Sequence, residues 1–138
     1  MAGKATDAET EKKRERYLIN ASIYLHGSEV RTIKSKCSRT DGKVIDIRDE
    51  IHGVTSESCK WLLLQAEHGH QLAHIDLDSN ALIEKIKPFL LGYKWYFDLL
   101  NIIEDAHIEH LFGRNFPGMG QKLRFHNEVM LYYLPRKR

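Results

Sequence analysis

Two histidines spaced four residues apart, His70 and His74, constrain this chain more than any other feature, because they lie in a segment with the apolar pattern of a helix. On a helix, residues four apart project from the same face, about 6 Å apart along the axis. The two imidazoles can therefore converge on one metal ion. The spacing predicts a helix over residues 57–74 that presents two metal ligands near its C-terminal end.

The rest of the chain has the pattern of further helices around a little β-structure. It predicts helices up to residue 25 and over 93–112, strands over 30–36 and 44–47, a helical segment interrupted near Pro88 and Gly92, a loop over 113–120, and a final helix or extended tail over 123–133. The Thr-Asp-Gly-Lys turn at residues 40–43 joins the two strands into a short hairpin. We therefore expect an α+β, mainly helical fold.

Composition and charge favour one intracellular domain. A length of 138 residues suits a single domain with a modest core. The net charge of +2, from 21 basic and 19 acidic residues, gives no strong signal for binding a polyanion. The chain has no apolar run of about 20 residues that would span a membrane, no secretory signal and only two cysteines. We expect a charged, flexible tail over residues 1–16 and one domain over 17–138.

A zinc site needs a third protein ligand, together with an open position if it is catalytic. The segment 101–110 supplies candidates, and Glu104 begins a polar face directly after two isoleucines. If this helix packs antiparallel to the helix of the His pair, Glu104 turns towards the histidines. Asp105 and His107 are the alternatives, either as a ligand or as side chains that orient one.

The same packing should bury the isoleucines of the second helix, Ile102, Ile103 and Ile108, against the helix of the His pair. His68 lies two residues before His70 and therefore points about 200° away from it. We expect His68 at the surface.

The sequence His70-Gln71-Leu72-Ala73-His74 is also the zinc-peptidase pattern His-Glu-x-x-His with one letter changed, because Gln71 stands where such an enzyme keeps its general base. A glutamine cannot accept a proton from water, and general acid–base help is typically worth about 10² to 10⁴ in rate. The sequence therefore predicts a metal site that is inactive as written. Two explanations stay open: a natural pseudo-peptidase that binds rather than cuts, or a Glu-to-Gln substitution that inactivates a peptidase.

Three blocks, which together cover roughly residues 38 to 120, carry a family resemblance. Residues 40–45 are similar to a Thr-Asp-Gly-Lys strand entry, residues 70–75 to His-Glu-Ala-Gly/Ala-His-Val, and residues 100–109 with 116–118 to Leu-Asn-Ile-Leu-Glu-Asp-Ala-Arg-Ile-Glu…Tyr-Pro-Gly. In this order they resemble the zincin-like amino-terminal region of bacterial and phage proteins related to the cobaltochelatase subunit with a von Willebrand factor A domain. The chain ends before such a domain, as expected of a minimal protein or an excised piece.

The resemblance implies a zincin-like fold in which Zn²⁺ is held by His70, His74 and Glu104, with Gln71 at the position of the base. The strand Val44, Ile45, Asp46 and Ile47 is expected to pair with an extended substrate peptide at the sheet edge. We expect a protein or peptide partner, in the cytoplasm of a bacterium or of a phage-infected cell, and no membrane partner. The oligomeric state is left open.

Two other functions compete with this interpretation. One is a phage or bacterial interaction module without metal that binds a protein, or a nucleic acid through its basic runs at residues 12–14, 31–39 and 136–138. The nearly balanced charge does not favour nucleic acid. The other is a di-iron carboxylate protein, since Glu67 to His70 and Glu104 to His107 are both Glu-x-x-His. The short spacing between the two motifs, interrupted by Pro88, argues against it.

Overall fold

The computed structural model describes residues 7–48, 50–51, 53–90 and 92–133. Its elements are α1 (Asp7–His26), β1 (Arg31–Ser35), β2 (Arg39–Thr40), β3 (Val44–Arg48), α2 (Glu57–Asp76), α3 (Ser79–Ile86), the 3-10 helix η1 (Lys87–Leu90), α4 (Lys94–Asn115) and α5 (Pro117–Tyr133). The fold is α+β and mainly helical, as the sequence predicts. Residues 7–16 of the expected tail belong to α1, and residues 1–6 lie outside the described residues.

The sheet has three strands in the order β1–β3–β2. The short hairpin is formed by β2 and β3, which are antiparallel. At its turn, Gly42 has a φ of 95°, and Asp41 Oδ1 accepts hydrogen bonds from the backbone N–H groups of Lys43 and Val44. β1 runs parallel to β3 on the other side. The first predicted strand is therefore not the hairpin partner of the second, because a short extra strand takes that place.

The position of β3 contradicts the expectation that residues 44–47 offer an edge to a substrate peptide. β1 pairs along the whole of β3, and β2 covers Ile45 and Asp46 from the other side. Ile45 and Ile47 are 0% and 2% exposed because they turn into the core. A strand with buried isoleucines and neighbours on both sides has no continuous free edge.

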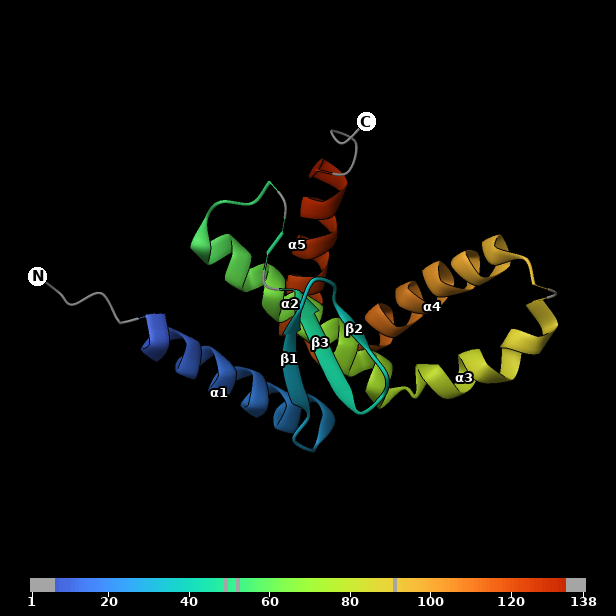
Figure 1. The fold of residues 1–138 in the computed structure, drawn as a ribbon, viewed down its shortest axis with the longest axis horizontal. Coiled ribbons are helices and arrows are strands. Elements are labelled where there is room, and N and C mark those ends of the chain that lie inside the picture. The colour runs from blue at the N-terminus through green and yellow to red at the C-terminus, as the bar shows by residue number, and fades with distance from the viewer. Residues whose placement is uncertain (1–6, 49, 52, 91, 134–138) are drawn as a thin grey trace, which may run out of the picture.

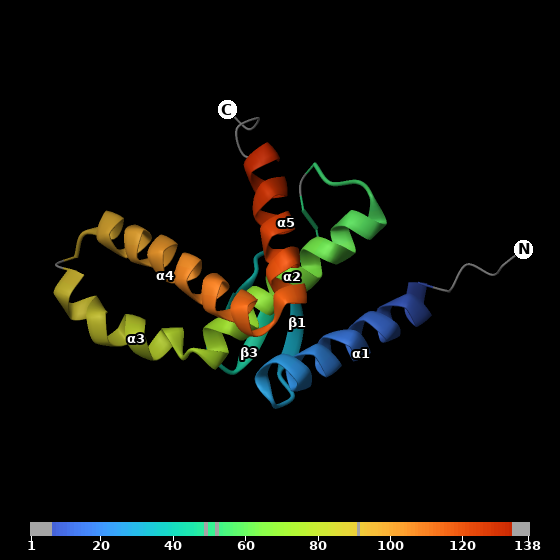
Figure 2. The same ribbon diagram turned by 180° about the vertical axis from the view of Figure 1, so that it is seen from behind.

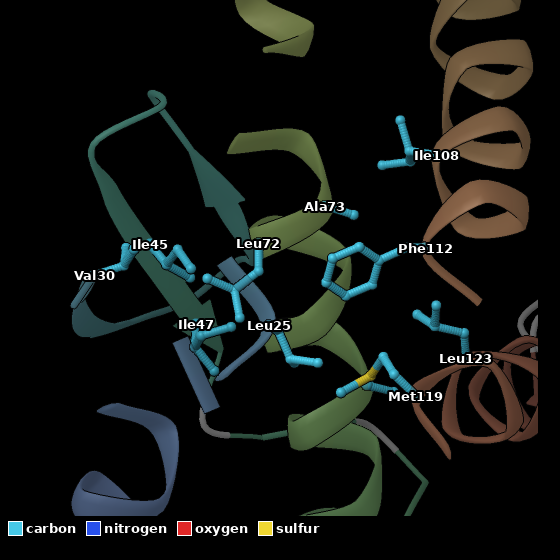
Figure 3. Packing of buried hydrophobic residues seen from close by; sticks show 11 residues of the cluster. Leu25, Val30, Ile45, Ile47, Leu72, Ala73, Ile108, Phe112, Met119 and Leu123 are labelled. Atoms are coloured by element: carbon cyan, nitrogen blue, oxygen red, sulfur yellow. The ribbon is translucent and has the colours of Figure 1, made fainter. Parts of the chain in front are cut away.

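α2 is the central element of the fold. Its first turn is capped by Ser56, whose side-chain oxygen accepts a hydrogen bond from the backbone N–H of Cys59. Figures 1 and 2 show α1 and the sheet on one side of α2, with α4 and α5 on the other. Apolar side chains from all these layers form the main core, shown in Figure 3: Leu25, Val30, Ile45, Ile47, Ala66, Leu72, Ala73, Ile108, Phe112, Met119 and Leu123.

Residues 113–120 are helical except at the junction near Phe116, and not the loop that the glycines and the proline predict. Pro117 is the first residue of α5, a position that suits proline because its missing N–H has no partner in a first turn. Gly113 and Gly120 let α4 and α5 approach closely, since a Cβ added to Gly120 would lie 3.0 Å from the Cα of Gly113. The glycines therefore serve helix contact rather than chain flexibility.

The predicted interruption near Pro88 and Gly92 is confirmed. α3 passes into the 3-10 helix η1, and Gly92 has a φ of 75° before α4 starts. Figure 1 shows α3, η1 and the first half of α4 projecting from the body on the side away from α1. We call this projection, residues 79–103 apart from residue 91, the arm.

Candidate metal centre

The site lies where the C-terminal half of α2 passes the middle of α4. Ile108 and Phe112 of α4 are 1% and 2% exposed and belong to the same core cluster as Ala73 of α2. Figure 3 shows both side chains directed towards Ala73. The small alanine lets the helices come close, so residues 104–109 lie beside His70 and His74.

Three donor atoms converge there. The Nε2 atoms of His70 and His74 are 2.9 Å apart, and Oδ1 of Asp105 lies 3.3 Å from the first and 3.1 Å from the second. His70 and His74 are half-buried, whereas the Asp105 side chain is 45% exposed and keeps one side of the group open to solvent. Among the His, Cys, Asp and Glu side chains in the described part of the chain, these three lie close enough together to hold a metal ion.

The other ring nitrogen of His70 contacts a carboxylate. Nδ1 of His70 lies 2.8 Å from Oε1 of Glu109, and the second oxygen of Glu109 accepts a hydrogen bond of 2.9 Å from the side-chain amide of Asn127 on α5. A carboxylate can only accept, so the hydrogen belongs on Nδ1 of the imidazole. That tautomer leaves the Nε2 lone pair of the neutral ring directed at the convergence point.

His74 also lies beside a carboxylate, at the other end of the site, although this contact has the distance of an ion pair without the geometry of a hydrogen bond. Its Nδ1 lies 3.1 Å from Oε2 of Glu104, which is 5% exposed. The hydroxyl of the buried Ser79, the first residue of α3, donates a hydrogen bond to the other oxygen of Glu104. Each imidazole therefore has its Nδ1 beside a buried or half-buried carboxylate, and each carboxylate is hydrogen-bonded to a further side chain.

Burial and the neighbouring charges shift the pKa values of His70 and Asp105 in opposite directions. Burial alone would lower the pKa of His70, but the hydrogen bonds and charges of Asp105 and Glu109 outweigh it and raise that pKa to about 9. Burial likewise acts to raise the pKa of Asp105, but the two histidines hold it well below its usual range. In the metal-free protein His70 therefore keeps its proton to a higher pH than an ordinary histidine does, beside the carboxylate of Asp105.

The acidic residue that completes the three-atom group is Asp105, and Glu104 instead contacts the far nitrogen of His74. His107 is exposed and does not join the group. Gln71 follows His70 on α2 and is 8% exposed. Both acids reach the His pair from α4: the buried Glu104 lies beside Nδ1 of His74, and the more exposed Asp105 lies beside both Nε2 atoms.

The packing of α4 also corrects the predicted burial of the isoleucines. Ile108 is buried, but Ile102 and Ile103 are 66% and 58% exposed. The expectation for these two residues is wrong, because the three isoleucines span about 220° of the helix circumference and one packing face cannot cover them all.

Sequence reasoning missed the residues that orient the histidines. Glu109 had a usable signal, because it follows Asp105 by four residues and therefore shares its side of α4. Ser79 and Asn127 had none, since each reaches the site only through the packing of α3 and α5 against the helix pair.

Two other polar residues of α2 belong to the interior. Glu67 is 7% exposed, and its Oε1 lies 2.6 Å from Nε of Arg48. His68 is 1% exposed rather than at the surface, because α2 is covered on its sides by the sheet, α1 and α5, and burial lowers its pKa to about 4. With Glu67 paired to Arg48 and His107 exposed, the described residues do not assemble the paired Glu-x-x-His arrangement of a di-iron site.

No family model matches this chain, and neither the curated proteins nor the solved structures include a match to it. The helices in the described part of the chain lack the combination of length and apolar character that crossing a membrane requires.

Proposed function

We propose that this protein is a zinc-binding, metallopeptidase-like protein that is inactive as a peptidase. His70, His74 and Asp105 are the proposed ligands, and Gln71 occupies the position of the general base. The observation that carries the proposal is the orientation of the two histidines. Each has its Nδ1 against a carboxylate, so that both Nε2 atoms meet Asp105 Oδ1 at one point.

The donor spacing supports the fit. With metal–ligand distances of about 2.1 Å, two donors of a tetrahedral zinc are ~3.4 Å apart and two neighbouring donors of an octahedral ion are ~3.0 Å apart. The three observed separations run from 2.9 to 3.3 Å. An ion therefore needs little movement of the side chains, and neutral imidazoles with a carboxylate suit zinc.

When bound at such a site, zinc acts as a Lewis acid and lowers the pKa of a coordinated water towards about 7. Whether that water is used for cleavage depends on the side chain at position 71. Gln71 can donate or accept a hydrogen bond but cannot take up a proton, so it can orient a water or a peptide amide without activating it. Peptide binding without cleavage is the outcome that this chemistry favours, and it agrees with the family resemblance of the three sequence blocks.

Metal analysis of the purified protein tests the metal site. We expect one zinc per chain in the wild type, and none in the His70→Ala and His74→Ala variants. His107→Ala is the matched control, because it removes an exposed histidine of α4 and should keep the metal. Stoichiometric metal in the double variant H70A/H74A would overturn the site.

The inactive-peptidase part has its own test. Cleavage of unstructured protein substrates is expected to be undetectable in the wild type and to appear, with dependence on zinc, in Gln71→Glu. Metal-dependent cleavage by the wild type at ordinary rates would refute the role given to Gln71. A zinc-loaded Gln71→Glu variant without cleavage would limit the protein to metal binding.

A further inference from the structure

α4 is apolar on two opposite sides, and only one of them is covered. The covered side bears Ile108 and Phe112. On the other side, five apolar residues recur at spacings of three and four, which places them within an arc of about 120°. These residues form the stripe: Trp95, Tyr96, Leu99, Ile102 and Ile103.

The stripe is exposed along its whole length. Trp95, Leu99 and Ile102 are 58%, 47% and 66% exposed. At the far end of the arm the apolar surface continues through an aromatic cluster. The ring centroid of Tyr96 lies 3.7 Å from that of Trp95 and 5.7 Å from that of Tyr93. Within the arm η1 contacts α4, and Figures 1 and 2 show no element of the described chain from outside the arm packed on its outer part.

The area is larger than a monomer normally leaves in water. The aromatic residues Phe89, Tyr93, Trp95 and Tyr96, with the aliphatic Leu82, Leu99, Ile102 and Ile103, expose roughly 700 Å² together. The largest apolar patch of a typical monomer is about 300–600 Å², and a stable interface takes about 800 Å² from each partner. Summed over α3, η1 and α4, the apolar surface of the arm is therefore close to what one half of a homodimer interface takes.

The shape of the surface indicates a helical partner. A stripe with three- and four-residue spacing over more than two turns presents the knobs and holes that another helix fills. A membrane-inserting tip would gather its apolar residues at the end of the arm, whereas here they continue to Ile102 and Ile103. The identical stripe of another chain has the matching length and apolar character, and a twofold axis closes such a pair without leaving a free face.

We propose that this protein forms a homodimer in which the α4 stripes of two chains pack against each other. The two arms then build a four-helix arrangement like a bundle. This interface lies on the side of α4 away from Ile108 and Phe112, and it does not depend on the metal site.

Light scattering during size-exclusion chromatography tests the dimer, in buffer with a chelator so that zinc cannot bridge chains. The wild type is expected at twice the chain mass of 16.1 kDa. Ile102→Glu should run as a single chain with the helical circular dichroism and melting behaviour of a folded protein. Leu131→Glu is the matched control, because Leu131 is an equally exposed apolar residue on α5 and its variant should stay dimeric.

Three results would overturn the proposal. One is a wild type that stays a single chain at all concentrations, and another is a dimer that folded Ile102→Glu leaves intact. The third is a monomeric wild type that sediments with phosphatidylcholine and phosphatidylglycerol vesicles and loses this binding in Ile102→Glu, which would assign the stripe to a membrane surface.

Discussion

Replacing one carboxylate at a time by its amide distinguishes the roles of Glu104 and Asp105, the two acidic residues beside the His pair. If Asp105 is the ligand, Asp105→Asn removes an anionic donor from the metal itself, and zinc affinity should fall by more than about 100-fold. Glu104→Gln keeps all three donors but weakens the partner of His74 Nδ1. Such indirect changes typically reduce affinity by about 10- to 100-fold, or about 1.4–2.7 kcal/mol.

The stability of the metal-free protein should change in the opposite order. The Asp105 side chain is 45% exposed, so solvent screens its interaction with the His pair, and its amide variant should lose less stability than the variant of the buried Glu104. Glu104 is buried between His74 and the Ser79 hydroxyl. A glutamine there turns an amide N–H towards a ring N–H or leaves a buried group without a partner, which costs about 1–3 kcal/mol.

Competition with a chromophoric zinc chelator gives the affinities, and urea unfolding in the presence of a strong chelator gives the stabilities. Asp98→Asn is the control for a charge change on an exposed part of α4. The reversed pattern, in which Glu104→Gln abolishes zinc binding and Asp105→Asn leaves it within tenfold of the wild type, would refute the assignment of Asp105. Glu104 would then be the ligand that the family resemblance implies.

Three further predictions rest on the pKa values and the close contacts. The metal must displace a proton from His70, whose pKa is about 9. Apparent zinc affinity should therefore rise about tenfold per pH unit between pH 6 and 8 in buffered chelator titrations. A flat profile would contradict the raised pKa of His70. The pKa of His68 is about 4 in the folded protein and ~6.5 in the unfolded chain, so the unfolded chain binds more protons between these values. The free energy of unfolding should therefore fall by up to about 3 kcal/mol as the pH drops from 6.5 to 4. In metal-free urea titrations His68→Leu should lack this loss, and an unchanged pH dependence would show that His68 is not the cause. Gly120→Ala should destabilise the protein by about 1–3 kcal/mol, because the added methyl group meets the backbone of Gly113. Gly118→Ala is the control: it has open space around it and should be neutral or stabilising by up to about 1 kcal/mol in the same urea experiment. Equal effects of the two variants would contradict the close helix crossing.

The helix of the His pair is predictable because its signals are local. The sequence offers Ser56 or Ser58 as the cap, of which the structure uses Ser56, and the spacing of His70 and His74 fixes which side chains share a face. The pairing of the strands is not predictable in this way, because β1 pairs with β3 as a parallel strand and no turn sequence specifies that pairing. The junction near Pro117 has the sequence of a loop since glycine and proline usually end helices, yet here the glycines lie at a helix crossing.

The proposed third ligand is unpredictable from spacing for a related reason. Successive residues on a helix differ by 100° in direction, so the rotation of α4 about its axis decides which atoms of the His pair Glu104 and Asp105 each reach. That rotation is set by the fit of Ile108 and Phe112 against Ala73 and the first turns of α5, which depends on the assembled core. A local pattern can identify the acidic segment but not the acid that reaches the histidines.

The rotation of α4 ties the proposed metal ligands to the exposed stripe. With Phe112 buried at 2% exposure, the side of α4 that bears Asp105 and Glu109 must face α2, and Ile102 and Ile103 must then point away from the domain. Turning α4 by one residue to centre Glu104 on the His pair would withdraw Phe112 from the core. Burying a phenylalanine contributes about 1.5–3 kcal/mol, and leaving its cavity adds to the loss, so the core opposes that rotation. The same packed side chain therefore favours Asp105 as the ligand and leaves an apolar face that a second chain can cover.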